Sequence, residues 1–457
     1  MCCFSYGNLF VARMVRKKYL VSVIFAMSCS ALLAGFASAQ EPHSKTPILD
    51  AAAKSQAVDT AQSFYDLRTT PDYCQKILSK VDQLISKNLY RSELAKKDWT
   101  SARTECSKSI ATGKTIMELD KSLNEAIKKL HSSHCQFVTS NDETFYFLNA
   151  LFSRFDHKLK PVKMDFTGVI YGGGGLPFNQ VRYIVDGSPG EQSGFLVGDK
   201  IVTVCGEPFV GQANFFKTSG KKLAVVVERE GKGVTLSVTP LLKDPYSAYV
   251  EGMAKSVRII ETPVGKVGYV HLWAGGEESH EAFESLLSTK LSETDGLLLD
   301  LRDGYGGNSL TDLDYFYRDP AGYPLFVLKD RAGHKSGVKE YYNKPVVALI
   351  NGGSRSGKEL LAYSLKASGR AQLVGDRTAG YVLAGRLFPI DERCALYLAV
   401  ADGELDGRRL EGVGVNPDVL VANPEYKREV AQAQLEKAKE LLLPLLKKPL
   451  PTSGGSK

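Results

Sequence analysis

The sequence lacks any large surplus of positive charge. Of its 457 residues 58 are basic and 51 acidic, and four of the basic ones stand in the first 39 residues, which contain no acidic residue. The rest of the chain therefore has a net charge of only +3. This balance argues against a dedicated nucleic-acid surface, which would show as clustered Lys and Arg, so no nucleic-acid partner is expected. With 43% hydrophobic and 24% charged residues, the chain is expected to form two or three domains and not to be disordered.

Long apolar runs are missing after the first 40 residues, so no later segment is predicted to cross a membrane. The start of the chain differs. Basic residues 16–18 precede an apolar run, 19–34, and Ala39 ends a triplet of small residues that a signal peptidase accepts. Residues 1–39 are therefore predicted to be a signal peptide cleaved near Ala39, which makes the protein exported, either periplasmic or secreted. The alternative is an uncleaved anchor, because the uncharged stretch 19–40 is long enough to span a bilayer.

Cysteines are few, and no CxxC pair is present, which argues against a zinc site. Five cysteines follow the predicted signal peptide, so at least one thiol stays free even in a compartment that permits disulfides. A bridge between Cys74 and Cys106 is one option that the sequence leaves open.

Four regions with different patterns follow the predicted signal peptide. In residues 40–157 apolar residues recur at helical spacing, as in CQKILSKVDQLISKNLY and TIMELDKSLNEAIKKL, which predicts amphipathic helices. In residues 164–243 short β-branched runs alternate with glycine turns, which predicts a β-rich domain. In residues 256–421 strand-like runs such as GLLLDLRD, PVVALING and CALYLAVAD alternate with helical runs such as KELLAYSLKASG. Residues 422–457 are predicted to form a helix and a disordered tail. The predicted fold class is therefore α/β (α+β) and multidomain.

The β-rich region contains VDGSPGEQSGFLVGDKIVTVCGEPF, which resembles the PDZ domains attached to exported proteases. A PDZ domain binds an extended peptide as an added strand, and its backbone N–H groups receive the terminal carboxylate. The resemblance implies a peptide-binding loop that includes Gly168, Val169 and Ile170. A glycine-rich loop is also compatible with a plain turn.

A candidate nucleophile, Ser356, lies in INGGSRSGKELLAYSL, where an apolar strand runs into glycines and then into a helix. A serine at such a junction can be held with its hydroxyl exposed, while the following backbone N–H groups point at the group that it attacks. The alternative is structural, because Ser354 or Ser356 could cap the helix that begins near Lys358.

Four sequence blocks together resemble the C-terminal processing (tail-specific) peptidase family, which includes the tricorn-core proteases. GLLLDLRDGYGG is similar to the family's LDLRxNxGG, NGGSRSGKELLAYSLKASGRAQLVGDRTAG to NxxSASASEI…GRAxxVGxxTxG, and RRLEGVGVNPD to GxxxEGxGVxPD. KKLHSSHCQF matches a fourth block, LxDxHTxF. The resemblance covers nearly the whole mature chain. It implies an N-terminal helical region that carries the histidine motif, a PDZ domain and an α/β peptidase core of the tail-specific protease (ClpP/crotonase-like) type.

The resemblance assigns roles to individual residues. Aligning SRSGKE with the family's SASASE places the nucleophile at Ser356. Gly306, Gly307 and Gly357 match the positions of the oxyanion hole, where a side chain would obstruct the approach of the substrate carbonyl. In the structural alternative Gly306 and Gly307 only make a turn.

The sequence departs from the bacterial tail-specific branch at Tyr381, where TAGYV replaces a segment that carries the catalytic lysine. Tyrosine, with a pKa near 10, is a poor substitute for that base. Lys358 is expected to face elsewhere on its helix. A role for Tyr381 in support of the site stays open.

The tricorn-like branch uses a histidine and a glutamate, and its positions correspond to His134 and Glu411, with Ser133 in support. An imidazole with a pKa near 6.5 suits proton transfer from serine, so turnover is expected to rise with pH through about 6 to 7. A carboxylate can orient the imidazole. The alternatives are a packing histidine and a solvated glutamate, and His131 is a rival base.

The resemblance implies an exported serine endopeptidase that cleaves exported or unfolded proteins and needs no metal and no organic cofactor. Its expected partners are protein or peptide substrates with exposed C-termini, and a homo-oligomer stays open. The alternative is a catalytically inactive peptide- or ligand-binding protein that retains the peptidase fold, since the lysine is missing.

Overall fold

The computed structural model describes residues 67–173, 175–308, 310–316, 326–329, 335–338 and 342–446, which all belong to one structural unit, Val58–Lys457. The predicted signal peptide and the predicted disordered tail lie outside the described residues. Among the described helices none combines the length and the apolar character that a membrane span requires.

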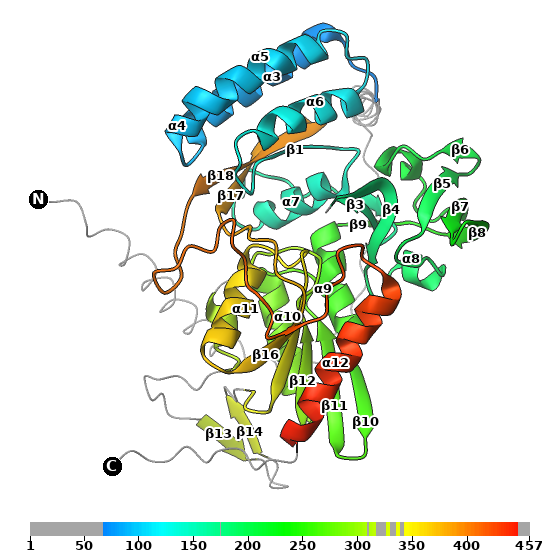
Figure 1. Cartoon of the computed structure of the whole chain (residues 1–457). Helices are drawn as coiled ribbons and strands as arrows, with labels where there is room; N and C mark the ends of the chain where they lie inside the picture. Colours follow the sequence, from blue (N-terminus) through cyan, green and yellow to red (C-terminus); the bar gives the residue numbers. More distant parts are fainter. Residues whose placement is uncertain are drawn as a thin grey trace, which may run out of the picture. The chain divides into compact units, whose positions relative to one another are not determined.

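A six-stranded sheet forms the centre of the α/β region (Figure 1). In spatial order its strands are β10 (Arg258–Thr262), β11 (Gly265–His271), β12 (Gly296–Asp300), β15 (Val346–Ile350), β16 (Ala371–Gly375) and β19 (Val419–Leu420). The strands from β11 to β19 are parallel, and β10 is an antiparallel edge strand. Every residue of β12 and β15 is buried, as expected for parallel strands covered on both faces.

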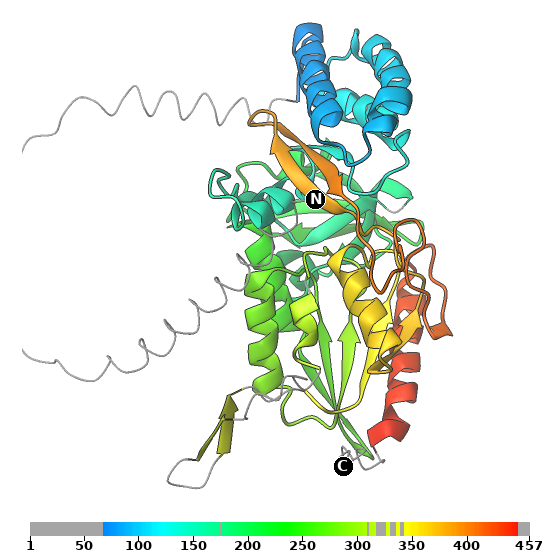
Figure 2. The same cartoon turned by 90° about the vertical axis from the view of Figure 1, so that its left-hand side faces the viewer.

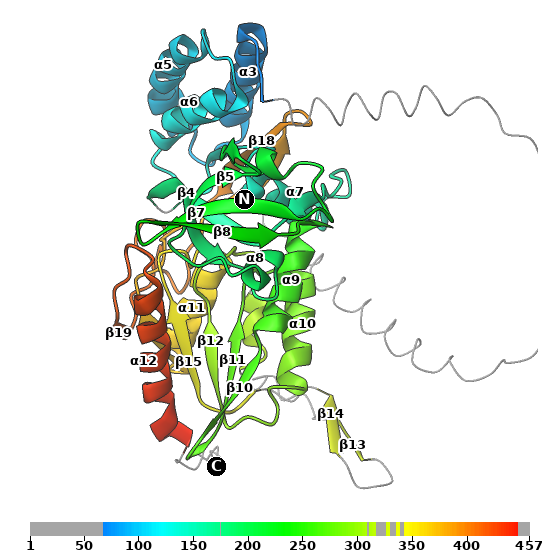
Figure 3. The same ribbon diagram turned by 90° about the vertical axis from the view of Figure 1, so that its right-hand side faces the viewer.

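Helices cover both faces of this sheet (Figure 3). They are α9 (Pro245–Ser256), α10 (Glu277–Ser288), α11 (Gly357–Ala367) and α12 (Arg428–Leu446). Leu297 and Leu299 of β12 pack in one core cluster with α9, α10 and α11, whereas Leu298 packs with Ala438 and Leu442 of α12. Successive side chains of a strand point to opposite faces, so one apolar run serves both layers. The α/β fold class is therefore confirmed.

The N-terminal region is helical, as the spacing of its apolar residues predicts. Its helices are α3 (Pro71–Asn88), α4 (Ser92–Leu94), the π-helical turn η1 (Ala95–Trp99), α5 (Thr100–Ile110), α6 (Ile116–Lys128) and α7 (Glu143–Ser153). The helix α6 begins at a capping box, in which Thr115 and Glu118 satisfy each other's backbone N–H groups.

The sequence places the run CALYLAVAD among the strands of the α/β region, and this placement is wrong. The run forms β18 (Cys394–Ala401), which pairs antiparallel with β1 (Gln136–Thr139) and β17 (Ala384–Pro389) in a separate sheet. Leu396 and Leu398 pack in one cluster with α3, α5 and α6, beside which the hairpin lies in Figure 2. Periodicity identifies a strand but not its partner. Because β1 follows the histidine motif directly, its pairing with β18 holds the motif in place.

The second region forms a second six-stranded sheet, with the order β3-β4-β5-β7-β8 and β6 paired to β5, and a separate pair, β2 with β9. Its elements are β2 (Met164–Phe166), β3 (Val169–Gly173), β4 (Leu176–Ile184), α8 (Pro189–Gln192), β5 (Lys200–Val204), β6 (Glu207–Pro208), η2 (Gln212–Phe215), β7 (Leu223–Arg229), β8 (Lys232–Val238) and β9 (Leu241–Lys243). Three further short elements are η3 (Leu310–Leu313), β13 (Phe326–Lys329) and β14 (Lys335–Val338). The identification of the second region as a PDZ domain stays a prediction.

Candidate active site

Ser356 lies at the junction between β15 and α11, at the position before the helix, with φ 57° and ψ −128°. A non-glycine residue in this region of conformational space is strained, and such strain is concentrated at functional sites. Ser356 and Glu359 are arranged as a capping box, in which N of Ser356 donates to Oε2 of Glu359 at 3.3 Å. The buried Oγ of Ser354 donates to the carbonyl of Leu301 at 2.8 Å and accepts from N of Asn351 at 3.0 Å. Ser354 therefore has a structural role inside the fold.

The glycines of the predicted oxyanion hole lie against this serine. A Cβ on Gly306 would be 2.5 Å from Cβ of Ser356, and one on Gly357 would be 2.3 Å from O of Asn308. Gly307 has φ 97°, which favours glycine. In the described part of the chain, neither N–H of Gly307 nor N–H of Gly357 donates to an acceptor. Two backbone donors are thus free beside the serine hydroxyl.

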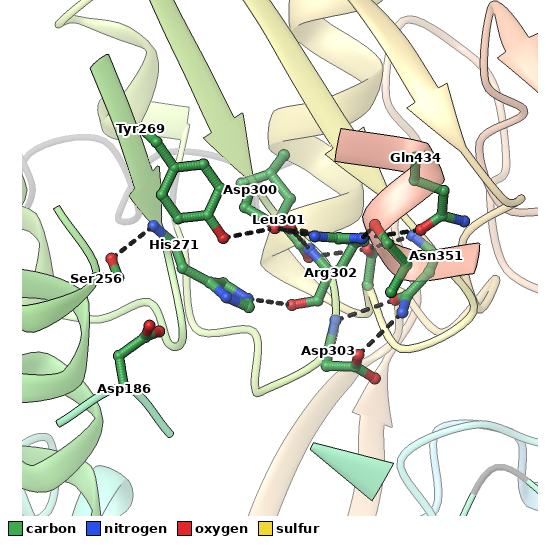
Figure 4. A network of polar contacts seen from close by, with 12 residues as sticks. Asp186, Ser256, Tyr269, His271, Asp300, Leu301, Arg302, Asp303, Asn351 and Gln434 are labelled. Atoms are coloured by element: carbon green, nitrogen blue, oxygen red, sulfur yellow. Dashed lines mark hydrogen bonds and ion pairs between the residues drawn. The ribbon is translucent and has the colours of Figure 1, made fainter. Parts of the chain in front are cut away.

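The turn that carries these glycines is fixed by a buried polar network (Figure 4). Arg302 donates from Nε to Oδ1 of Asp300 at 2.9 Å and from Nη1 to Oε1 of Gln434 on α12 at 2.9 Å. Burial alone would raise the pKa of Asp300, but the Arg302 guanidinium holds it well below its usual range. Nδ2 of Asn351 donates to Oδ2 of Asp303 at 3.0 Å, and N of Asp303 donates to Oδ1 of Asn351, also at 3.0 Å. The LDLRDG and INGG blocks are thereby locked together.

His134 belongs to a chain of three side chains. Oγ of Ser133 lies 2.9 Å from Nδ1 of His134 and donates to Oε2 of Glu411 at 2.8 Å, and N of Ser133 donates to Oε1 at 3.0 Å. Burial, together with the positive charge of Arg355, lowers the pKa of His134 to about 4. The imidazole is therefore neutral at neutral pH, and the expectation of a pKa near 6 to 7 is corrected. His131 is exposed and makes no contact with Glu411.

The segment from Gly380 to Val382 joins the two halves of the site. N of Ser356 donates to O of Tyr381 at 2.7 Å, and N of Val382 donates to Oε2 of Glu411 at 2.9 Å. The side chain of Tyr381 is 50% exposed, so this residue contributes through its backbone. Among the described residues no hydrogen bond joins His134 to Ser356.

Two charged residues near the serine are informative. Glu359 was not predicted as a site residue, and its carboxylate accepts from N of Gly380 at 2.7 Å and from N of Tyr381 at 2.6 Å. The Ser-x-x-Glu spacing from Ser356 is a capping signal that could have found it. Among the described residues Lys358 makes no hydrogen bond to Ser356. It is fully buried, donates from Nζ to O of Asp303 at 2.6 Å, and its pKa is lowered to about 7 by burial.

The predicted peptide-binding residues lie at the start of β3, which is an edge strand of the described sheet. A Cβ on Gly168 would be 2.1 Å from Cβ of Ser188, and N of Val169 already donates to Oγ1 of Thr167 at 3.2 Å. Val169 and Ile170 pair with β4 on one side. No hydrogen bond connects these residues to Ser356 or His134 within the described ranges.

Neither a metal centre nor a disulfide is formed by the residues that the structure describes. No group of three or more His, Cys, Asp or Glu side chains is arranged to hold a metal ion. Cys74 and Cys106 are both buried, and neither is part of a disulfide. The three other described cysteines are also free thiols.

Comparison with known proteins identifies the region that contains Ser356. Residues 266–421 match the model of peptidase family S41. A stretch of 282 residues is 26% identical to a carboxy-terminal-processing protease of Bartonella bacilliformis, and covers 57% of this chain and 63% of that protein. A stretch of 257 residues is 25% identical to the carboxy-terminal processing protease CtpB of Bacillus subtilis, with 52% of each covered. The chain thus spans between half and two thirds of these relatives. The crystal structure of the tricorn protease is similar with a TM-score of 0.48 and 17% identity, over 81% of this chain and 36% of that one.

Proposed function

We propose that this chain, whose residues 266–421 form a domain of peptidase family S41, is a serine endopeptidase of the C-terminal processing type. The observation that supports this best is the double role of Glu411. Its Oε2 accepts from Oγ of Ser133, which also contacts His134. The same oxygen accepts from N of Val382. The residue before Val382, Tyr381, accepts from N of Ser356 through its carbonyl. A candidate base and a candidate nucleophile are thus held by one carboxylate.

The hydrogen bonds determine which nitrogen of His134 is available. Because the hydroxyl of Ser133 donates to Glu411, its oxygen accepts the proton of Nδ1, and this fixes the tautomer in which Nε2 is unprotonated. A neutral Nε2 can accept a proton from Ser356 and then transfer it to the leaving amine. The carboxylate of Glu411 stabilises the transient imidazolium through Ser133.

The other half of the site supplies the nucleophile and the groups that stabilise the oxyanion. Oγ of Ser356 attacks the scissile carbonyl, and the oxyanion accepts hydrogen bonds from N–H of Gly307 and N–H of Gly357. Water then hydrolyses the acyl-enzyme, with His134 again as the base. The direct contact between His134 and Ser356 would form when substrate is bound, since catalytic hydrogen bonds are often long in free enzymes.

The proposed substrates are exported or unfolded proteins with exposed C-termini. The position of β3 at the edge of its sheet supports this, because an extended peptide can add to an edge strand through its backbone. The proposal places the protein outside the cytoplasm, periplasmic or secreted, on the basis of the charge and apolar pattern of residues 1–39.

The test is hydrolysis of an unfolded protein with an apolar C-terminus, followed by mass spectrometry of the fragments. The purified protein should generate internal cleavages, and Ser356→Ala should generate none. Ser285→Ala, a change of an exposed serine on α10, should cleave like the wild type. An inert wild type that still binds the protein would instead support a catalytically inactive binding protein.

A further inference from the structure

Arg355 is the residue before the proposed nucleophile, at a position where the family block SASASE has alanine. Its guanidinium is fixed on the turn that carries the oxyanion glycines. Nε donates to O of Gly304 at 3.2 Å, and Cζ lies 4.5 Å from the centre of the Tyr305 ring. The turn residues 304 and 305 directly precede Gly306, so the positive charge is held beside the proposed oxyanion hole.

The same charge also acts on the proposed base. Arg355 contributes to the lowered pKa of His134 and opposes the effect of burial on the pKa of Tyr397. The ring of Tyr397 lies 5.3 Å from that of His134. The guanidinium therefore lies on the turn beside the proposed oxyanion hole, and its charge extends to the surroundings of the histidine.

The guanidinium has unused donors. Within the ranges that the structure describes, neither Nη atom of Arg355 donates to an acceptor and no carboxylate forms an ion pair with it. Two acidic residues at the start of α7 are close enough to feel its charge. Each accepts a hydrogen bond from another residue, and Oε1 of Glu143 is buried without a partner among the described residues. Oδ1 of Asp142 accepts from N of Thr144 at 2.8 Å, and Oε2 of Glu143 accepts from the hydroxyl of Tyr305 at 2.6 Å.

The charge of Glu143 is also reduced. Burial raises the pKa of Asp142, and it raises the pKa of Glu143 to about 7. Glu143 is therefore only partly ionised at neutral pH and compensates Arg355 only in part. A guanidinium with two free Nη groups is suited to bind a carboxylate with two parallel hydrogen bonds.

We propose that Arg355 determines specificity by binding a carboxylate of the peptide substrate close to the scissile bond. The carboxylate comes either from an acidic side chain or from the C-terminus of the substrate. This inference rests on the proposed peptidase function and adds a substrate class to it. Arg355 itself takes no part in proton transfer.

Matched peptides test the proposal. One pair differs by Glu or Gln next to the cleaved bond, and a second pair differs by a free or an amidated C-terminus near that bond. The wild type should cleave one carboxylate-bearing peptide with a kcat/KM about tenfold or more above its neutral partner, the effect of one charged hydrogen-bonded pair. The pair that shows the difference identifies the source of the carboxylate.

Variants assign the preference to the guanidinium. Arg355→Gln should remove it by lowering kcat/KM about tenfold for the carboxylate peptide, with little change for the neutral one. Arg355→Lys should retain part of it, because lysine keeps the charge but not the planar fork. Arg91→Gln, a change of an exposed arginine beside the Tyr90 ring, should behave as the wild type. Equal losses on both peptides in Arg355→Gln, or no preference in the wild type, would overturn the proposal.

A binding measurement separates this inference from the peptidase proposal. Fluorescence anisotropy with Ser356→Ala and labelled peptides reports recognition without turnover. Tighter binding of the carboxylate peptide, lost in Ser356→Ala/Arg355→Gln, supports the inference even if no peptide is hydrolysed. Equal binding of both peptides contradicts it even if the wild type is an active peptidase.

Discussion

Oγ of Ser133 donates to Oε2 of Glu411 at 2.8 Å, across 278 positions of the sequence. The same oxygen of Ser133 lies 2.9 Å from Nδ1 of His134. The serine therefore stands between the imidazole and the carboxylate, and the glutamate acts on the histidine only through it. This arrangement gives Ser133 a positioning role that can be tested apart from the chemistry of Ser356.

Ser133→Ala should lower kcat about tenfold to a hundredfold with little change in KM, because the tautomer and orientation of His134 are no longer fixed. Ser133→Thr keeps the hydroxyl and should restore most of the activity. Steady-state kinetics on one peptide measures both. A purely structural serine would give equal losses in the two variants or a change in KM alone.

The pH dependence of kcat/KM follows from the environment of His134. Its pKa lies at about 4 in the fold, below the ordinary value near 6.5, because burial disfavours the charged imidazolium. Activity should rise as pH increases through about 4, where the ring loses its proton, and stay level from about pH 6 to 8. A rise centred between pH 6 and 7 would show that the histidine is more exposed to solvent than the structure has it.

Gly306→Ala should abolish turnover while the protein still folds. The new methyl group would lie 2.5 Å from Cβ of Ser356, so the serine and the oxyanion turn must separate. Gly403→Ala is the matched control, since nothing lies within 4 Å of its added Cβ. Turnover and the far-ultraviolet circular dichroism spectrum are measured for both. An active Gly306→Ala enzyme would mean that the turn does not contribute to the site.

The exposed side chain of Tyr381 is expected to be dispensable. Tyr381→Phe should cost at most about tenfold in kcat/KM, the size of one hydrogen bond near the site, since the residue acts through its backbone. Tyr381→Lys should not increase turnover. An inert wild type that Tyr381→Lys activates would identify a decayed Ser/Lys enzyme and exclude the base proposed here.

Local patterns predicted much of this fold. The apolar spacing found α3 and α6, and three of the four family blocks lie within residues 266–421, which match the model of peptidase family S41. Properties that depend on distant partners were not predictable in the same way. The pairing of β18 with β1 requires the apolar surface of three helices, which no window of sequence contains.

The electrostatic surroundings of the site illustrate the same limit. The sequence indicates an imidazole at His134 but not its burial, which lowers its pKa to about 4. The position of the Arg355 guanidinium depends on a hydrogen bond to a turn 51 positions away in the sequence. These features are set by tertiary packing, so only the folded arrangement reveals them.

We propose that Ser356 is a nucleophile that His134 activates. The most direct measurement is the reaction of the purified protein with a fluorophosphonate, followed by peptide mass mapping of the adduct. One adduct per chain is expected on Ser356, with labelling slowed strongly in His134→Ala and unchanged in His131→Ala. No adduct on Ser356 in the folded wild type, or labelling that is equally fast in His134→Ala, would contradict it.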